Sequence, residues 1–336
     1  MAVPPGEFSP EFAPELPARL PIELPLGDGL SWSVSFRDVT SGRVLHAQGA
    51  HDLLPTASVG KVFALIDLAA RATAGEVDLT EIVDRRDALA VADSGTWQHL
   101  HVDRLSLADV AVLIGSTSDN WATNVLLDRL GLDQVQRRAS TLVSGGSTLH
   151  DHVRDVRTNA DPATLSSGCA DDWTHLLGEV ARGTCIDEQT SALVRRWLSL
   201  GTDLSMVAAA FDLDPLAHAE PPETQPTHTE TSHTQPTRTE TAQTEPDLGI
   251  RLFHKTGTDV GVRADVGVIS RGDAAVAYAC LCRWDDDGSR PTRHRVLAAL
   301  RELGECALDL VTAEQASAEP ASAEQVTTEQ ATTPPT

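Results

Sequence analysis

Apolar and polar residues alternate over two short stretches near the start of the chain and over three near its end. Alternation with a period of two is typical of strands that bury one face. It predicts strands over residues 30–37 and 43–48, joined by a turn at Ser41 and Gly42. Three more strands are predicted as a meander over residues 250–257, 262–270 and 274–284.

Between these strands the apolar pattern has the period of a helix. Over residues 58–71 apolar side chains cover nearly every face, which is typical of a central, buried helix. Further helices are predicted over residues 106–114, 121–130, 169–182 and 188–200, and a closing helix over residues 292–311. The order predicts an α+β sandwich: one five-stranded antiparallel sheet with terminal helices, beside a helical lobe of residues 59–217. The cleft between them is the expected place for a site.

Three stretches lack the apolar residues that a packed core needs. Residues 1–28 are rich in Pro and Glu, residues 219–248 nearly repeat Thr, Pro, Glu and His, and residues 312–336 repeat Ala-Glu-Gln and Thr-Glu-Gln units. We expect a disordered N-terminal segment, a single folded domain over residues 29–311 with a disordered insertion at 219–248, and a disordered tail.

Charge and cysteine content exclude several classes of protein. The net charge is −23, and the three low-complexity segments carry −4, −5 and −4 of it, so the remaining body is also acidic. An acidic body disfavours nucleic acid and anionic membranes as partners. We expect no membrane span, because no run of 18 apolar residues occurs. The start of the chain lacks the pattern of a secretory signal, which with the free thiols predicts a cytoplasmic protein.

The five cysteines are odd in number and form no Cys-x-x-Cys pair. They are better explained as small buried apolar residues than as metal ligands, and we expect no metal and no cofactor. Lysine is far scarcer: the 26 basic side chains include only Lys61 and Lys255. A coding bias toward Arg explains the scarcity but not the two exceptions. Lysine, unlike arginine, can lose its proton when it is buried, so these positions direct the search for a site.

The first lysine follows a serine by three positions at the start of the predicted central helix, in Ser58-Val59-Gly60-Lys61. That spacing places both side chains on one face of a helix. A serine hydroxyl is a weak nucleophile until a base removes its proton, and a buried lysine with a lowered pKa can be that base. Taken alone, the pattern is explained as well by a helix cap beside a surface lysine.

Two more short motifs follow. Ser118-Asp119-Asn120 precedes a predicted helix, where a capping role is the alternative to a proton-shuttling Ser118 and a substrate-binding Asn120. Lys255-Thr256-Gly257 closes a predicted strand. There Lys255 supplies positive charge, the Thr256 hydroxyl can bind a carboxylate, and Gly257 admits close approach to the backbone.

Together, in this order, the three motifs resemble the signature of the class A β-lactamases and penicillin-binding proteins. The resemblance spans residues 30–311 without the insertion. It implies an acyl-enzyme on Ser58, with Lys61, Ser118 and Lys255 as catalytic partners. It further implies an oxyanion hole made by the backbone N–H groups of Ser58 and Thr258. Arg263, on the next strand, is similar to the family's second carboxylate anchor, and a surface charge is its alternative.

One part of the family pattern is missing. Class A β-lactamases release the acyl group with water activated by a loop glutamate, and this chain has no Glu between Glu81 and Glu179. The candidate bases in the equivalent stretch are Asp151, His152 and Asp155. All are shorter than Glu or differently shaped, and a base must reach its water within hydrogen-bond distance. Asp155 is also explained as an ion-paired loop anchor. We therefore expect acylation to be faster than deacylation.

Three functions fit these observations. The first is a serine hydrolase that opens β-lactam amides through Ser58, with slow deacylation. The second is an esterase or amidase for another small acyl compound, which the missing Glu and signal favour. The third is a non-catalytic penicillin-binding or interaction protein. In the first two cases the partner is a small-molecule substrate.

Overall fold

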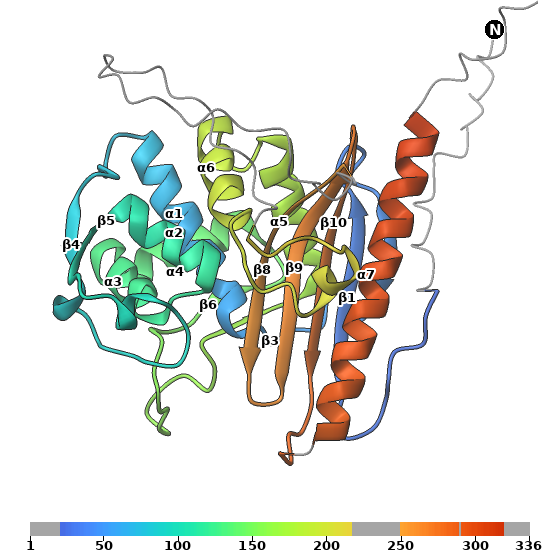
Figure 1. Cartoon of the computed structure of the whole chain (residues 1–336), viewed down its shortest axis with the longest axis horizontal. Coiled ribbons are helices and arrows are strands. Elements are labelled where there is room, and N and C mark those ends of the chain that lie inside the picture. Colours follow the sequence, from blue (N-terminus) through green and yellow to red (C-terminus); the bar gives the residue numbers. More distant parts are fainter. Residues whose placement is uncertain (1–20, 217–248, 289, 319–336) are drawn as a thin grey trace, which may run out of the picture.

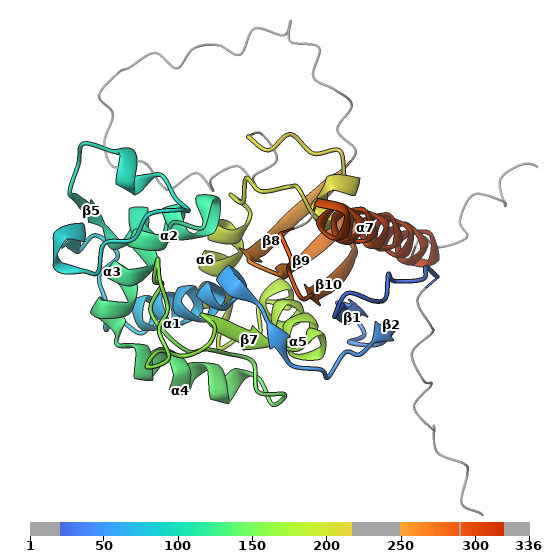
Figure 2. The ribbon, with the colours of Figure 1, turned by 90° about the horizontal axis from the view of Figure 1, so that it is seen from below.

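The computed structural model describes residues 21–216, 249–288 and 290–318. The α+β fold is confirmed: a large antiparallel sheet lies between a long C-terminal helix and a lobe of helices (Figure 1). Seen from below, the helices of the lobe gather on the side of the sheet opposite α7 (Figure 2). The low-complexity segments at 1–20, 217–248 and 319–336 lie outside the described residues, so the predictions made for them stay predictions.

The sheet has the strand order β2-β1-β10-β9-β8, and every neighbouring pair is antiparallel. Its first and last segments in the sequence meet in the middle, where β1 pairs with β10 from Ser31↔Arg283 to Asp38↔Val276. This order leaves β8 as an edge strand beside the helical lobe. The strands are β1 (Ser31–Asp38), β2 (Val44–Gln48), β8 (Ile250–Asp259), β9 (Val262–Arg271) and β10 (Ala274–Arg283).

The helices lie close to the predicted positions, with one addition, α4. They are α1 (Lys61–Thr73), α2 (Leu107–Thr117), α3 (Asn120–Leu130), α4 (Leu132–Leu142), α5 (Ala170–Arg182), α6 (Glu188–Leu198) and α7 (Arg290–Ala318). Short 3-10 turns are η1 (Ala57–Gly60), η2 (Arg85–Asp87), η3 (Trp97–His99) and η4 (Val207–Ala210). Two small sheets join β3 (Leu54–Pro55) with β7 (Ser166–Gly168) and β6 (Thr148–Leu149), and β4 (Ile82–Asp84) with β5 (Arg104–Ser106).

Two apolar cores fix the layers. One lies between the sheet and the lobe and contains most of α1, whose residues from Lys61 to Ala70 are all buried, as the all-round apolar pattern predicts. The other lies between the opposite face of the sheet and α7. Cys280 and Cys282 both point into this second core, because alternate residues of a strand share a face. All five cysteines are free and buried.

The structure differs from the expectations in three places. The closing helix extends to Ala318, so its last turns replace part of the tail predicted to be disordered from residue 312. Residues 206–211, assigned to the helical lobe, pack instead in the core beside α7. Residues 21–28, expected in a disordered segment, bury Leu24, and the Trp32 indole donates to the Pro25 carbonyl at 2.9 Å. In each case burial of a few apolar side chains against α7 or the sheet outweighs the local composition.

Candidate active site

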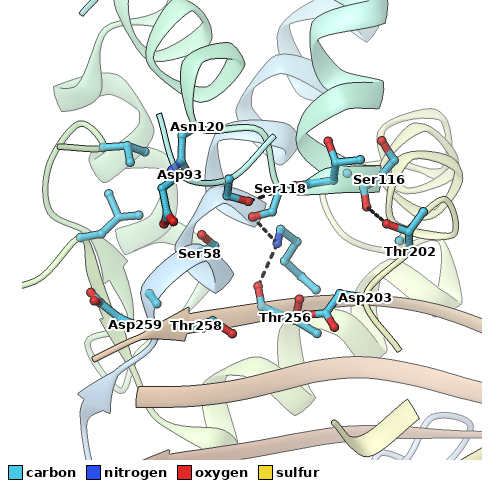
Figure 3. A pocket seen from close by; sticks show the side chains of 18 of the residues that line it. Ser58, Asp93, Ser116, Ser118, Asn120, Thr202, Asp203, Thr256, Thr258 and Asp259 are labelled. Atoms are coloured by element: carbon cyan, nitrogen blue, oxygen red, sulfur yellow. Dashed lines mark hydrogen bonds between the residues drawn. The ribbon is translucent and has the colours of Figure 1, made fainter. Parts of the chain in front are cut away.

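A cavity of about 750 Å³ lies where the edge strand β8 meets the helical lobe. Ser58, Ser118, Asn120, Lys255 and Thr256 all line it. Figure 3 shows Ser58, Ser118 and Thr256 gathered around this space, although they come from three distant parts of the sequence. The three motifs that the sequence singles out therefore meet in one pocket.

Ser58 sits on a strained turn. Ala57, the residue before it, has φ +47°, a backbone conformation that costs energy for a residue with a side chain. Buried Ser166 holds this turn, because its hydroxyl donates to the Ala57 carbonyl at 2.5 Å and lies 2.7 Å from the Thr56 hydroxyl. Ser58 itself is half-buried at the cavity wall. Within the described part of the chain, no hydrogen bond engages its side-chain hydroxyl, which leaves that group available to a ligand.

Lys61, one helical turn later, is completely buried. Its Nζ donates to the Ser118 carbonyl at 2.6 Å and to Asn120 Oδ1 at 2.7 Å, and lies 3.3 Å from Ser118 Oγ. A neutral amine has two N–H groups and one lone pair. The two short contacts use both N–H groups, so the lone pair remains free to accept a proton.

Ser118 joins the two lysines. It ends α2 in the left-handed conformation, with φ +56°. Its Oγ accepts a hydrogen bond from Lys255 Nζ at 2.9 Å, and Lys255 Nζ also donates to the Thr256 carbonyl at 2.8 Å. The Ser118 hydroxyl thus lies between both amines of the chain, as a proton shuttle requires.

Burial sets the charge of both lysines. It is the main cause that lowers the pKa of Lys61 well below its ordinary value of 10.5, and the charge of Lys255 lowers it further. Burial likewise lowers the pKa of Lys255 to about 8, against an opposing effect of Asp203. Burial therefore lets Lys61 lose its proton far more easily than an exposed lysine does, whereas a pKa of about 8 leaves Lys255 mostly charged near neutral pH.

Asn120 opens α3, immediately after the cap of that helix, Asp119, whose Oδ1 accepts the Ala122 N–H at 2.9 Å. Within the Ser118-Asp119-Asn120 motif, Asp119 therefore has the capping role that the sequence offered as an alternative. The Asn120 Nδ2 donates to the Ala92 carbonyl at 3.1 Å. A side-chain amide has two N–H groups, so one remains for a substrate carbonyl, and the predicted binding role of Asn120 stays open.

Arg263 does not reach the cavity in this structure. Its Nη1 donates to the carbonyls of Asp259 at 2.9 Å and Val262 at 2.6 Å, and its guanidinium lies 5.7 Å from the ring centroid of Trp284. It pairs in register with Thr258 at the end of β8, so the backbone is where the prediction placed it. The carboxylate-anchoring role of Arg263 stays a prediction and requires the side chain to leave Trp284.

The three candidate bases for deacylation are separated. Asp151 is buried and accepts hydrogen bonds from Arg154 at 2.7 Å and Arg157 at 2.8 Å, so it ties its loop together. His152 Nε2 lies 2.9 Å from Asp128 Oδ1. Neither is among the residues that line the cavity in the described chain. Asp155 does line it, and its Oδ1 accepts the Ala92 N–H at 3.1 Å.

Among the cavity residues that the sequence analysis missed are two acids, Asp93 and Asp203. Asp93 has φ +68° and lines the same cavity as Ser58, as the labels in Figure 3 show, and its charge raises the pKa of Lys61 against the effect of burial. Asp203 lies beside Thr256 in the same view. Both stand in irregular segments without a motif, and only their proximity to the lysines reveals them.

No group of three or more His, Cys, Asp and Glu side chains suited to a metal ion occurs among the described residues. Within the same ranges, no helix has the length and apolarity to cross a membrane.

Comparison with known proteins agrees with this geometry. Among curated proteins, none matches the sequence. Among solved structures, a β-lactamase from Sphaerobacter thermophilus has a TM-score of 0.65 and 21% identity, over 85% of this chain and 93% of that one. PBP-A has a TM-score of 0.62 and 18% identity, over 86% and 92%. A class A β-lactamase from Mycobacterium abscessus has a TM-score of 0.60 and 18% identity, over 83% and 94%.

At these identities the structural matches establish a shared fold. A comparison of the sequence with family profiles establishes the family as well. The profile of the family described as "Beta-lactamase enzyme family" matches residues 26–311. That range holds all three motifs and both lysines, and it covers most of the chain. The chain belongs to the β-lactamase enzyme family.

Proposed function

We propose that this chain is a serine hydrolase that opens β-lactam amides or related acyl compounds through an acyl-enzyme on Ser58, with slow release of the acyl group. One observation carries the proposal: the Ser118 hydroxyl lies between Lys61 and Lys255, at 3.3 and 2.9 Å, in the cavity that Ser58 lines. A mutant of PBP-A, one of the similar structures, is an acyl-enzyme complex with penicillin G.

In the first step the Ser58 hydroxyl transfers its proton to neutral Lys61, and Oγ attacks the carbonyl carbon. The backbone N–H groups of Ser58 and Thr258 then stabilise the oxyanion. The support is that η1 packs against β8 at Gly257, next to Thr258. Loss of one such donor typically costs about 3 kcal/mol of transition-state stabilisation.

In the second step the bond from the carbonyl carbon to the leaving nitrogen or oxygen breaks. The leaving atom needs a proton, and Ser118 Oγ can deliver one while it takes another from protonated Lys61. The charge on Lys255 assists, because its Nζ donates to the same Ser118 oxygen. An opened β-lactam gives a Ser58 ester that still carries the new amine, whereas an acyclic amide or ester gives the Ser58 ester and a released amine or alcohol. Water must later attack that ester and return a proton to Ser58 Oγ.

Slow deacylation rests on the residues that face the cavity. Of the three candidate bases, Asp155 alone lines it, and its carboxylate already accepts the Ala92 N–H. That hydrogen bond engages one of the two carboxylate oxygens, so part of the Asp155 side chain is already used to hold the loop. The acyl-enzyme is therefore expected to accumulate.

The test is labelling of the intact protein by a fluorophosphonate and by penicillin G, followed by mass spectrometry. We expect an adduct of each on Ser58, none on Ser58→Ala, and slow loss of the penicillin adduct. Hydrolysis of nitrocefin and p-nitrophenyl esters is measured in parallel. Adducts of the fluorophosphonate alone favour the esterase or amidase. No adduct at all leaves the non-catalytic interaction protein.

A further inference from the structure

The end of the cavity at Thr256 carries an acid of the chain itself. Asp203 lines the same cavity as Ser58, Lys255 and Thr256, and Figure 3 shows its side chain beside Thr256. Its position is fixed locally, because Ser205 donates to Asp203 Oδ1 through its hydroxyl at 2.6 Å and through its backbone N–H at 3.2 Å. Asp203 is exposed to the solvent of the cavity, so it meets whatever binds there.

The hydrogen bonds around Asp203 favour its charged form. Partial shielding from water by the surrounding chain raises its pKa, but hydrogen bonds from the hydroxyls of Ser205 and Thr256 outweigh that effect, and the pKa of Asp203 lies below its ordinary value. The Thr256 hydroxyl, which could bind a substrate carboxylate, thus already faces a carboxylate of the chain.

Both cations near this end also face Asp203. Among the acids, Asp203 has the largest effect in raising the pKa of Lys255, and it likewise leads the acids that raise the pKa of Arg263. Arg263 is moreover held by two carbonyls at the end of β8 and by Trp284. A negative charge of the chain itself therefore acts on both cations that would attract an anionic substrate.

We propose that the Asp203 carboxylate occupies the place of a substrate carboxylate, so that the site selects acyl compounds with no anionic group beside the reacting carbonyl, namely uncharged or cationic esters and amides. This inference rests on the acyl transfer to Ser58 proposed above and narrows its substrate class. A second carboxylate at Thr256 would lie beside Asp203, and like charges placed together disfavour binding. A neutral ligand meets no such repulsion.

The experiment uses two compounds that differ only in this charge, penicillin G and its methyl ester. The second-order rate constant of Ser58 acylation is measured by intact-protein mass spectrometry for the full chain, for Asp203→Asn and for Asp212→Asn. The control Asp212 lies in the same segment, outside the residues that line the cavity, and asparagine tolerates its left-handed backbone, φ +50°. Fluorophosphonate labelling and urea unfolding report whether each variant keeps its nucleophile and its fold.

We expect the unaltered chain to react with the methyl ester at least about tenfold faster than with the free acid, as like-charge repulsion of this kind predicts. Asp203→Asn should raise the rate with the free acid and bring the two rates within about threefold, whereas Asp212→Asn should keep the original ratio. Equal rates in the unaltered chain, or an unchanged ratio in a folded Asp203→Asn, overturn the inference while the acyl-enzyme stands. Failure of both penicillins and the fluorophosphonate to label Ser58 overturns the proposed function and this inference with it.

Discussion

Gly257 on β8 lies against the backbone of Thr56, two residues before Ser58. A Cβ at position 257 would come within 2.1 Å of the Thr56 carbonyl oxygen and 3.2 Å of the Ser58 nitrogen. Its φ is not in the left-handed region, so the requirement for glycine here is space and not backbone freedom. The edge strand can therefore pack this closely against the Ser58 turn only because residue 257 has no side chain.

Gly257→Ala should therefore push β8 away from η1 and misplace the Thr258 N–H. We expect a loss of about 1–3 kcal/mol in the free energy of unfolding, the usual cost of overpacking. The acylation rate should fall by about tenfold or more, because an oxyanion donor must lie close to its final position. Urea unfolding and mass-spectrometric acylation kinetics measure the two effects. Gly178→Ala in α5 is the matched control, since its Cβ would meet only Arg182 Nη1 at 3.6 Å. Equal acylation rates in both variants would contradict the role of the Thr258 N–H as an oxyanion donor.

The sequence predicts the site well where the chemistry is local. Ser58 and Lys61 are one helical turn apart, and Lys255 stands out because the chain has only one other lysine. The alternating pattern also places Lys255 correctly in a strand near its end. These features depend on spacing and residue type alone, so they can be predicted without knowledge of tertiary contacts.

Other features depend on contacts between distant segments. Asp203 lies in an irregular stretch, and nothing near it in the sequence indicates that it meets Thr256. Arg263 has the expected position on β9, but Trp284 and two carbonyls decide the direction of its side chain. Residues 206–211 turn to the α7 face because buried Asp265 binds the Val207 N–H at 3.0 Å. Side-chain direction and loop path are tertiary properties, and local pattern does not determine them.

Lys255 makes stability depend on pH in a definite direction. Unfolded lysine keeps its proton to about pH 10.4, whereas burial lowers the pKa of folded Lys255 to about 8. Between these values the unfolded state holds more protons, so the free energy of unfolding rises with pH in that window. We expect the unaltered chain to gain about 3 kcal/mol from pH 8 to 10.5 relative to Lys255→Met, which lacks the titrating group. The free energy of unfolding of both proteins is measured by urea denaturation over this range. The same dependence on pH in both would refute the lowered pKa of Lys255.

The same two lysines predict a bell-shaped pH profile for acylation. The rate should rise with pH as Lys61 loses its proton, which burial makes possible well below the ordinary lysine pKa. It should fall above about pH 8, where Lys255 loses the charge that supports Ser118. Fluorophosphonate or penicillin labelling between pH 5 and 10 measures both limbs. Lys255→Met should be slower and lose the alkaline limb, and a rate that keeps rising to pH 10 would contradict this role.

Asp265 is a buried acid that connects the sheet to η4. Its Oδ1 accepts a hydrogen bond from the Tyr278 hydroxyl at 3.1 Å and lies 3.0 Å from His254 Nδ1, and its Oδ2 accepts the Val207 N–H. Removal of one member of a buried network leaves the others unpaired, so Asp265→Ala should cost about 3–5 kcal/mol in the free energy of unfolding. Tyr278→Phe removes one hydrogen bond and should cost only about 1 kcal/mol. Chemical denaturation compares the two, and similar losses would show that Asp265 is not the centre of the network.

Asp155 is the candidate base for deacylation that lines the cavity with Ser58. Its carboxylate faces the cavity and also holds Ala92, so it can act as the base for water, as a loop anchor, or as both. Asp155→Asn keeps an oxygen that can accept the Ala92 N–H but removes the basic group. If Asp155 activates the water, the lifetime of the Ser58 adduct should lengthen by about tenfold or more while acylation changes little, because general base catalysis contributes at least that much. Asp151→Asn is the comparison: Asp151 does not line the cavity, so the loss of part of its pairing with Arg154 and Arg157 should lower stability without a selective effect on the adduct. An unchanged lifetime in Asp155→Asn would leave water without a carboxylate base from this loop, and slow release would then be a property of the whole site.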